Sequence, residues 1–193
     1  MISLGFLIMI ARHIRRMEQE IHRVSLRDEL TGLYNLRGFR LLAEQAMRLA
    51  WRSQVPFSVL FVDLDGLKEI NDSLGHAVGS AFLVETAGLL TATFRETDVI
   101  ARIGGDEFAV AGQFCRTVIG VAEHRIKDQA SRTRLEVSGG RPLSLSLGSA
   151  TIDENHPTPL QDLLDEADLA MYEDKRRKKM HPFRGGRNSA VQA

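Results

Sequence analysis

The chain has 193 residues and a formal net charge of zero, because 25 Lys and Arg balance 25 Asp and Glu, and this argues against a nucleic-acid-binding surface spread over the whole molecule. The apolar content of 44% and the charged content of 26% are typical of a globular protein and exclude a disordered chain. Cys115 is the single cysteine, which excludes an intramolecular disulfide and suits a reducing compartment, so we expect a cytoplasmic location. From the neutral charge balance we expect no DNA or RNA partner.

The chain opens with an apolar run at residues 2–11, which Arg12, Arg15 and Arg16 follow. A helix of that length reaches only about 15 Å, half of a bilayer core of roughly 30 Å. One interpretation is the end of a membrane helix that begins in a missing upstream segment, so that the remainder is the cytoplasmic part of an inner-membrane protein. The other is a soluble apolar end that packs on a partner.

Apolar residues then alternate in steps of three and four, which is the spacing of a heptad seam. The seam consists of Leu7, Ile10, Ile14, Met17, Ile21 and Val24. It predicts either a parallel two-stranded coiled coil that pairs two copies of the chain, or one amphipathic helix that lies on its own domain. We treat residues 1–27 as this separate N-terminal element.

Helices and short strands alternate along the rest of the chain. Apolar residues at helical spacing predict helices over 36–53, 77–94, 116–130 and 159–175. Apolar β runs predict strands over 57–62, 99–103, 108–111 and 143–151. The last strand alternates apolar with small polar residues, as a strand buried on one face does. We therefore expect one α+β domain over 28–180 with a mixed, partly antiparallel sheet, followed by a frayed tail over 181–193.

Acidic residues gather at the ends of two of these strands. Asp63 and Asp65 close the strand that starts at residue 57, and Asp106 and Glu107 occupy a tight hairpin turn after the glycines at 104–105. Clustered carboxylates repel one another unless a cation lies between them, and Mg²⁺ is typically held by one or two carboxylates plus substrate phosphates. The glycines allow positive φ and a close approach of a phosphate to the backbone.

The string Gly104-Gly105-Asp106-Glu107-Phe108 resembles the signature of the GGDEF family, the bacterial diguanylate cyclases. A given pentapeptide arises by chance in a chain of this length on the order of once in ten thousand. Further motifs resemble the family in order and spacing from about residue 28 to 179. They are DELTGLYN at 28–35, DLDGLKEIND at 63–72, SLG at 146–148 and ADLAMY at 167–172.

Members of this family join two GTP molecules into cyclic di-GMP and release pyrophosphate. The resemblance implies a fold similar to the palm of nucleotidyl cyclases and polymerases, in which helices wrap the sheet. It also implies that Asp63, Asp106 and the backbone carbonyl of Leu64 hold two Mg²⁺ per active site, with Mn²⁺ as an alternative. Glu107 is then the candidate that helps to deprotonate the attacking 3′-hydroxyl.

The resemblance further implies that Lys68 and Lys175 contact the triphosphate and that Asn71 hydrogen-bonds the guanine edge. Lys179 is expected to make a second phosphate contact from the same helix as Lys175. It stands where the family usually has an arginine, and a lysine lacks the fork that grips a phosphate in bidentate fashion. Each domain carries one nucleotide, so a cyclic product requires two domains that face each other in a homodimer.

Arg95 and Asp98 form an R-x-x-D sequence, for which a surface ion pair is the ordinary interpretation. Five residues separate Asp98 from Gly104, which is the spacing of the family's inhibitory site for product. Arginine can bind guanine or phosphate in bidentate fashion. We therefore expect a cyclic dinucleotide to bind here.

Ser80 departs from the family, which normally has a guanine-binding aspartate after the glycine at this point. Loss of a charged hydrogen bond costs roughly 1.5–3 kcal/mol, and a hydroxyl can meet either guanine or adenine. The substitution resembles the hybrid, promiscuous subgroup that also makes cyclic GMP-AMP from GTP and ATP. An ordinary cyclase with weaker GTP binding is a second interpretation. A catalytically weak or inactive domain that binds cyclic di-GMP or dimerises is the third.

Overall fold

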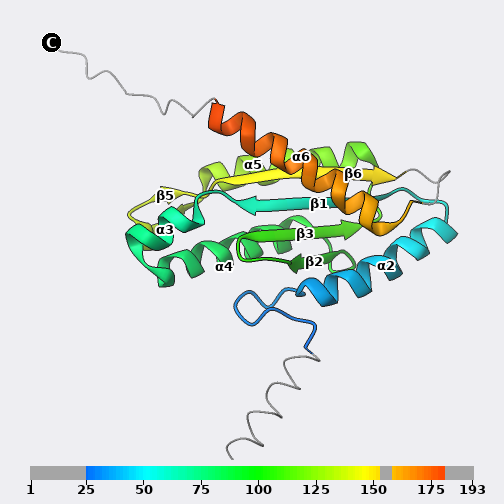
Figure 1. Ribbon diagram of the computed structural model, residues 1–193, viewed down its shortest axis with the longest axis horizontal. Coiled ribbons are helices and arrows are strands. Elements are labelled where there is room, and N and C mark those ends of the chain that lie inside the picture. Colours follow the sequence, from blue (N-terminus) through cyan, green and yellow to red (C-terminus); the bar gives the residue numbers. More distant parts are fainter. Residues whose placement is uncertain (1–24, 153–157, 181–193) are drawn as a thin grey trace, which may run out of the picture.

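The computed structural model describes residues 25–152 and 158–180, so the predicted apolar run, the heptad seam and the tail lie outside the described residues. A four-stranded sheet in the order β2-β3-β1-β6 forms its centre (Figure 1). The strands are β1 Phe57–Leu64, β2 Val99–Arg102, β3 Glu107–Gly112 and β6 Leu145–Ile152. All three strand pairs are antiparallel, and an isolated bridge between Tyr34 and Ala101 adds one parallel contact. The predicted α+β fold with a mixed, partly antiparallel sheet is thus confirmed.

Helices cover both faces of the sheet (Figure 1). The helices α2 Leu36–Arg52 and α6 Leu160–Met180 pack on one face, and α4 His76–Thr93 and α5 Arg116–Arg132 pack on the other. A short helix, α3 Leu67–Leu74, follows β1 at the end of the sheet. Beside it lies a small hairpin of β4 Arg134–Leu135 and β5 Arg141–Pro142, joined through the 3-10 helix η1 Glu136–Ser138. Among the described residues, no helix combines the length and apolarity that crossing a bilayer requires.

Strand β1 supplies alternate side chains to two separate cores. Leu60 and Val62 pack with the cluster that contains Phe82 of α4, whereas Phe57 and Val59 pack with the cluster of α2 and α6. Successive side chains of a strand point to opposite faces, so the odd-numbered residues of β1 face α2 and α6. Asp63 continues this odd-numbered row and therefore ends on the side of the sheet that α6 covers.

The expectation that the late strand is buried on one face only is wrong, because helices cover β6 on both faces. Leu145 and Leu147 join the core beneath α5, while Gly148 faces α6. A Cβ at Gly148 would lie 1.9 Å from the backbone nitrogen of Met171. The small residues of this strand are therefore not a solvated face, since they let the backbone of α6 approach the sheet.

Candidate active site

The two predicted acidic segments meet at the end of the sheet where β1 stops and β3 begins. Asp63 lies directly opposite Glu107 of β3 and Ser146 of β6 in the strand register. The Leu64 N–H donates to the carbonyl of Asp106 at 2.9 Å. Residues directly opposite each other on neighbouring strands share a face, so Asp63 and Glu107 present their carboxylates to the same side.

Asp63 is buried, with 4% of the residue exposed, and Lys175 of α6 donates to both of its carboxylate oxygens at 2.8 Å. Burial raises the pKa of Asp63, and the nearby charges of Asp106 and Asp65 add to this rise, which Lys175 only partly offsets. Burial alone lowers the pKa of Lys175, but its bond to Asp63 outweighs that effect and raises it. The site therefore concentrates more negative charge than its own lysine neutralises.

The turn between β2 and β3 is held by its backbone and by Glu107. The N–H groups of Ile103 and Gly104 both donate to the Glu107 carbonyl, at 2.9 and 3.3 Å. Neither Gly104 nor Gly105 has a positive φ. The expectation that glycines occur here because the backbone needs a positive φ is therefore wrong. Gly104 has another effect, because a Cβ there would lie 2.4 Å from Oε2 of Glu107 and would displace that carboxylate. A Cβ at Gly105 would meet nothing within 4 Å, so that glycine leaves open space beside the turn.

Glu107 has the environment of a proton acceptor. Burial raises its pKa, and the charges of Asp106, Asp63 and Asp168 raise it further. A carboxylate whose pKa is raised is a stronger base than that of an ordinary glutamate. The predicted role of Glu107 is compatible with this environment.

Arg102 ties the signature turn to the segment before α2. Its guanidinium donates to the Gly105 carbonyl through Nη2 at 2.7 Å and to both carboxylate oxygens of Asp28 through Nη1 at 3.3 Å. Asp28 in turn accepts from the N–H and hydroxyl of Thr31. Burial raises the pKa of Asp28, but Thr31 and Arg102 outweigh burial and lower it below its usual value. Two of the motifs in the sequence are thus joined in space.

The oxygen donors at this end of the sheet fit a hard divalent cation. Across 25–152 and 158–180, no three His, Cys, Asp or Glu side chains lie close enough to hold a metal ion by themselves. Mg²⁺ does not require three, because it commonly binds one or two carboxylates together with water and phosphates. The Asp106 N–H donates no hydrogen bond to the carbonyl of Leu64. That carbonyl oxygen is therefore available as a ligand, together with the carboxylates of Asp63 and Asp106.

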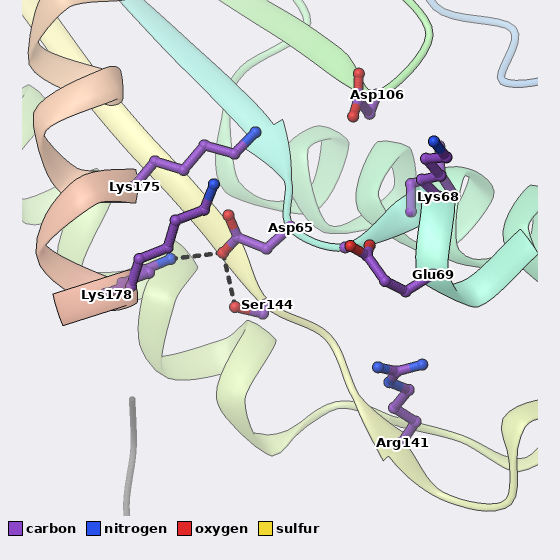
Figure 2. Close-up of a pocket in the computed structure, with 11 residues that line it drawn as sticks. Asp65, Lys68, Glu69, Asp106, Arg141, Ser144, Lys175 and Lys178 are labelled. Atoms are coloured by element: carbon purple, nitrogen blue, oxygen red, sulfur yellow. Dashed lines mark hydrogen bonds and ion pairs between the residues drawn. The ribbon is translucent and has the colours of Figure 1, made fainter. Parts of the chain in front are cut away.

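A pocket of about 430 Å³ opens next to Asp106 (Figure 2). The predicted phosphate ligands Lys68, Lys175 and Lys179 all line it, from α3 on one wall and α6 on the other. Lys178 and Arg141 also line this pocket, although the sequence analysis assigned no role to either. The structure therefore gathers a cationic cavity beside the acidic end of β1.

Lys178, which lies in the basic run at 175–179 near the end of α6, bonds to the sheet. Its Nζ donates to Asp65 at 2.9 Å, to Ser146 Oγ at 3.3 Å and to the Leu145 carbonyl. Ser144 also donates to Asp65, at 2.7 Å (Figure 2). Burial raises the pKa of Asp65, but the hydrogen bonds from Ser146 and Lys178 outweigh it and lower the pKa. Asp65 is thus a structural carboxylate that fixes α6 to the sheet.

A family model described as diguanylate cyclase, GGDEF domain, matches residues 25–181. The chain belongs to the GGDEF family. It is similar to the diguanylate cyclase TpbB of Pseudomonas aeruginosa, strain UCBPP-PA14, with 39% identity over 152 residues, which covers 77% of this chain and 35% of TpbB. It is also similar to the probable diguanylate cyclase DgcC of Escherichia coli K12, with 33% identity over 86% of this chain and 44% of DgcC. The chain thus spans less than half the length of these relatives.

Solved structures agree with this assignment. The isolated GGDEF domain of TpbB from Pseudomonas aeruginosa PAO1 superimposes with a TM-score of 0.68 and 38% identity, covering 78% of this chain and 89% of that one. The coiled coil and GGDEF domain of DgcB from Caulobacter crescentus, in complex with c-di-GMP, gives a TM-score of 0.74 at 22% identity and covers 90% and 93%. At that identity the second likeness concerns the fold alone.

Asn71, one of the two predicted base-reading residues of this GGDEF domain, packs against α4 at Gly79, the residue before Ser80. A Cβ at Gly79 would lie 1.9 Å from Oδ1 of Asn71, so the glycine lets the amide of α3 rest against α4. Ser80 follows Gly79 directly and is half-buried. Its hydroxyl makes no hydrogen bond with any described residue, whereas Thr86 on the same helix donates to the Phe82 carbonyl at 2.8 Å. The Ser80 hydroxyl is therefore available to a ligand.

Arg95 and Asp98 lie at the far end of β3 from Glu107. A Cβ at Gly112, the last residue of β3, would lie 2.8 Å from Oδ1 of Asp98. The Asp98 carboxylate accepts from the backbone N–H of Arg95 at 2.8 Å, and no ion pair joins the two side chains. Burial raises the pKa of Asp98 despite this hydrogen bond. Arg95 and Asp98 therefore form no close ion pair, although the charge of Arg95 acts to lower the pKa of Asp98, and Arg95 is exposed.

Proposed function

We propose that this GGDEF domain condenses two GTP molecules into cyclic di-GMP with release of pyrophosphate, and that it acts as a homodimer. The observation that supports this most is the bond from Lys175 to Asp63, because it joins the acidic end of the sheet to the cationic pocket. A triphosphate in that pocket has its charged chain beside lysines and its reacting end beside carboxylates. Since its substrate is a nucleoside triphosphate, we propose a cytoplasmic location for the domain.

Asp63, Asp106 and the Leu64 carbonyl would hold the two divalent cations on which diguanylate cyclases depend. Bound there, such cations would supply a Lewis acid for the 3′-hydroxyl and neutralise charge on the α-phosphate. Glu107 takes the proton of the attacking 3′-hydroxyl, and its raised pKa suits that task. A bond then forms between the 3′-oxygen and the α-phosphorus, and the bond to the β-phosphate breaks. Two such transfers close the ring and release two pyrophosphates.

The phosphate chain lies between α3 and α6. Lys68 and Lys179 have no carboxylate within ion-pair distance among the described residues, so their charges are free to meet phosphate oxygens. Lys175 neutralises Asp63 in the substrate-free domain and lines the same pocket. It can therefore pass from the carboxylate to a phosphate when substrate binds.

A homodimer follows from the stoichiometry of the reaction. One phosphate pocket of this size, about 430 Å³, serves one triphosphate, so the second nucleotide is held by a facing copy of the domain. The heptad seam over Leu7 to Val24, outside the described residues, is a means to pair two copies.

Relaxed base selectivity is the second part of the proposal. The free hydroxyl of Ser80 can accept from the guanine N1–H or donate to the adenine N1, whereas a carboxylate would accept only. We propose that the domain uses ATP together with GTP and makes cyclic GMP-AMP besides cyclic di-GMP.

Incubation of the purified protein with Mg²⁺ and GTP, ATP or both, with products resolved by chromatography, tests both parts. We expect cyclic di-GMP from GTP alone and a mixed product when both nucleotides are present. Ser80→Asp should restore guanine preference by about one to two decades, the equivalent of a charged hydrogen bond. Use of GTP alone despite abundant ATP would contradict relaxed selectivity. Absence of product from a dimeric protein would reject catalysis in favour of a binding or dimerising module.

We also propose that the exposed guanidinium of Arg95, with Asp98, binds the cyclic dinucleotide product and arrests the enzyme. Product at this end of β3 would not compete directly with substrate, because the catalytic carboxylates lie at the other end. Arg95→Ala should weaken binding of cyclic di-GMP in calorimetry by about tenfold or more, the loss of one charged hydrogen-bonding group. Unchanged binding would show that product binds elsewhere.

A further inference from the structure

The phosphate pocket has a third wall that the proposed function leaves without a role. The small β4–β5 hairpin forms this wall, and Arg141 at the start of β5 directs its guanidinium toward the cavity (Figure 2). Lys68 of α3 and Lys179 of α6 line the other two walls. Among the residues that line this pocket, Arg141 is the one arginine.

The backbone that carries Arg141 is firmly held. Its N–H donates to Ser138 Oγ at 3.1 Å, and Ser138 Oγ donates to the Leu135 carbonyl at 2.7 Å. Gly139 and Gly140 turn the chain with φ of 70° and 82°, values that glycine adopts without strain. The Arg141 guanidinium itself is exposed and has no hydrogen-bond or ion-pair partner in the described part of the chain. The backbone of Arg141 is thus held in place, while its guanidinium is left free to meet an anion in the cavity.

Five cationic side chains and three acidic ones, Asp65, Glu69 and Asp106, line the cavity, so its lining carries a net positive charge that favours an anion. Lys175 and Lys178 are already paired with aspartates at the end of β1. Arg141, Lys68 and Lys179 have no such partner among the described residues, and they surround the cavity from three different elements. Three unpaired cations around about 430 Å³ match a chain of several phosphates better than a single one.

We propose that Arg141 binds the terminal phosphate of the nucleoside triphosphate in this pocket, an assignment that rests on the proposed function. In Figure 2, Arg141 lies across the pocket from Asp106, so it meets the end of the phosphate chain farthest from the reacting phosphate. Its planar fork can grip two phosphate oxygens at once, whereas Lys179 offers a point charge. Arg141 thus supplies the bidentate phosphate contact that a lysine at position 179 does not provide. Its contact selects a triphosphate over a monophosphate and holds the pyrophosphate that leaves.

Calorimetric titration separates this role from a general electrostatic effect. The ligands are the α,β-methylene analogue of GTP, which cannot release pyrophosphate, and GMP, each with Mg²⁺. We expect Arg141→Ala to weaken binding of the triphosphate analogue about tenfold and binding of GMP less than about twofold. Arg141→Lys should recover only part of the loss, because lysine keeps the charge without the fork. Arg116→Ala, an exposed arginine at the start of α5, is the matched control and should change neither affinity.

Each result bears on one of the two proposals. Equal affinity of wild type and Arg141→Ala for the triphosphate analogue would overturn the role of Arg141 and leave the proposed function intact. An equal loss for GMP and the triphosphate analogue would also overturn it, because Arg141 would then not contact the terminal phosphate. A wild-type protein that binds no triphosphate analogue would overturn the proposed function itself, and the role of Arg141 with it.

Discussion

Lys175→Met is expected to destabilise the metal-free domain through Asp63. Methionine keeps the unbranched stem of the side chain but removes the ammonium group that donates to both Asp63 oxygens at 2.8 Å. The Asp63 side chain is only 6% exposed, whereas that of Lys175 is 30% exposed, so water can replace part of the lost contact. A hydrogen bond to a charged group contributes about 1.5–3 kcal/mol, and we expect a loss of about 2 kcal/mol in the free energy of unfolding. For a chain of this size the Tm falls by roughly 4–8 °C.

The loss should depend on pH in a definite direction. The pKa of Asp63 is raised above its usual 3.8 even with Lys175 present, so the folded state keeps a proton that the unfolded state has lost. Stability from this group therefore declines as pH rises from the usual pKa through the folded one. Lys175→Met raises the folded pKa of Asp63 further. The difference in stability between wild type and variant should grow from about pH 4 toward neutrality.

Thermal unfolding in the presence of a chelator, followed by circular dichroism between about pH 4 and pH 8, measures both effects. Lys179→Met is the matched control, because Lys179 lines the same pocket from the same helix without bonding a carboxylate among the described residues. We expect the control to lose little stability at any pH. Equal losses in the two variants, or a loss in Lys175→Met that is the same at every pH, would show that the bond from Lys175 to Asp63 does not stabilise the fold.

Two pairs of glycine variants test close contacts at and behind the site. Gly104→Ala should lower the Tm and reduce turnover, because its Cβ would lie 2.4 Å from a carboxylate oxygen in the signature turn, whereas Gly105→Ala, with nothing within 4 Å, should leave the Tm unchanged. Similar Tm values for both variants would contradict this. Gly148→Ala should destabilise the fold by about 3 kcal/mol or more, since its Cβ would lie 1.9 Å from the backbone of α6. Gly120→Ala, whose Cβ would lie in open space on α5, is the control and should leave the stability unchanged or raise it in chemical denaturation. Equal denaturation midpoints for Gly148→Ala and Gly120→Ala would show that α6 moves away from β6 at little cost.

Hydrophobic spacing and turn residues predicted most of the fold because they act locally. The hairpin was predicted from the glycines between two short apolar runs, and β2 and β3 occupy those positions within a residue or so. The helix at residue 36 begins where Asn35 accepts a hydrogen bond from the Gly38 N–H, a preference visible in the sequence. Helix α3 was not predicted, although Leu67 and Ile70 have helical spacing, because eight residues give too few turns to form a pattern.

The parts of the site that were not predicted depend on tertiary contacts. Lys178 resembled a solvated lysine in a basic run, and only the packing of α6 against β6 brings it to Asp65. Arg141 lies in a short segment between Gly140 and Pro142, and its place in the pocket follows from the folding of a hairpin that has no apolar pattern. Burial of β6 on both faces was missed because small residues indicate either solvent or a closely packed helix.

Divalent cations are expected to link the carboxylates of β1 and the signature turn to a bound triphosphate. The most direct measurement counts Mn²⁺ by electron paramagnetic resonance in the presence of the α,β-methylene analogue of GTP. Wild type should bind two Mn²⁺ per domain, and Asp106→Asn should lose at least one of them. Asp168→Asn, which removes another charge that Glu107 senses, should retain both. The same number of Mn²⁺ in Asp106→Asn as in wild type would contradict the account.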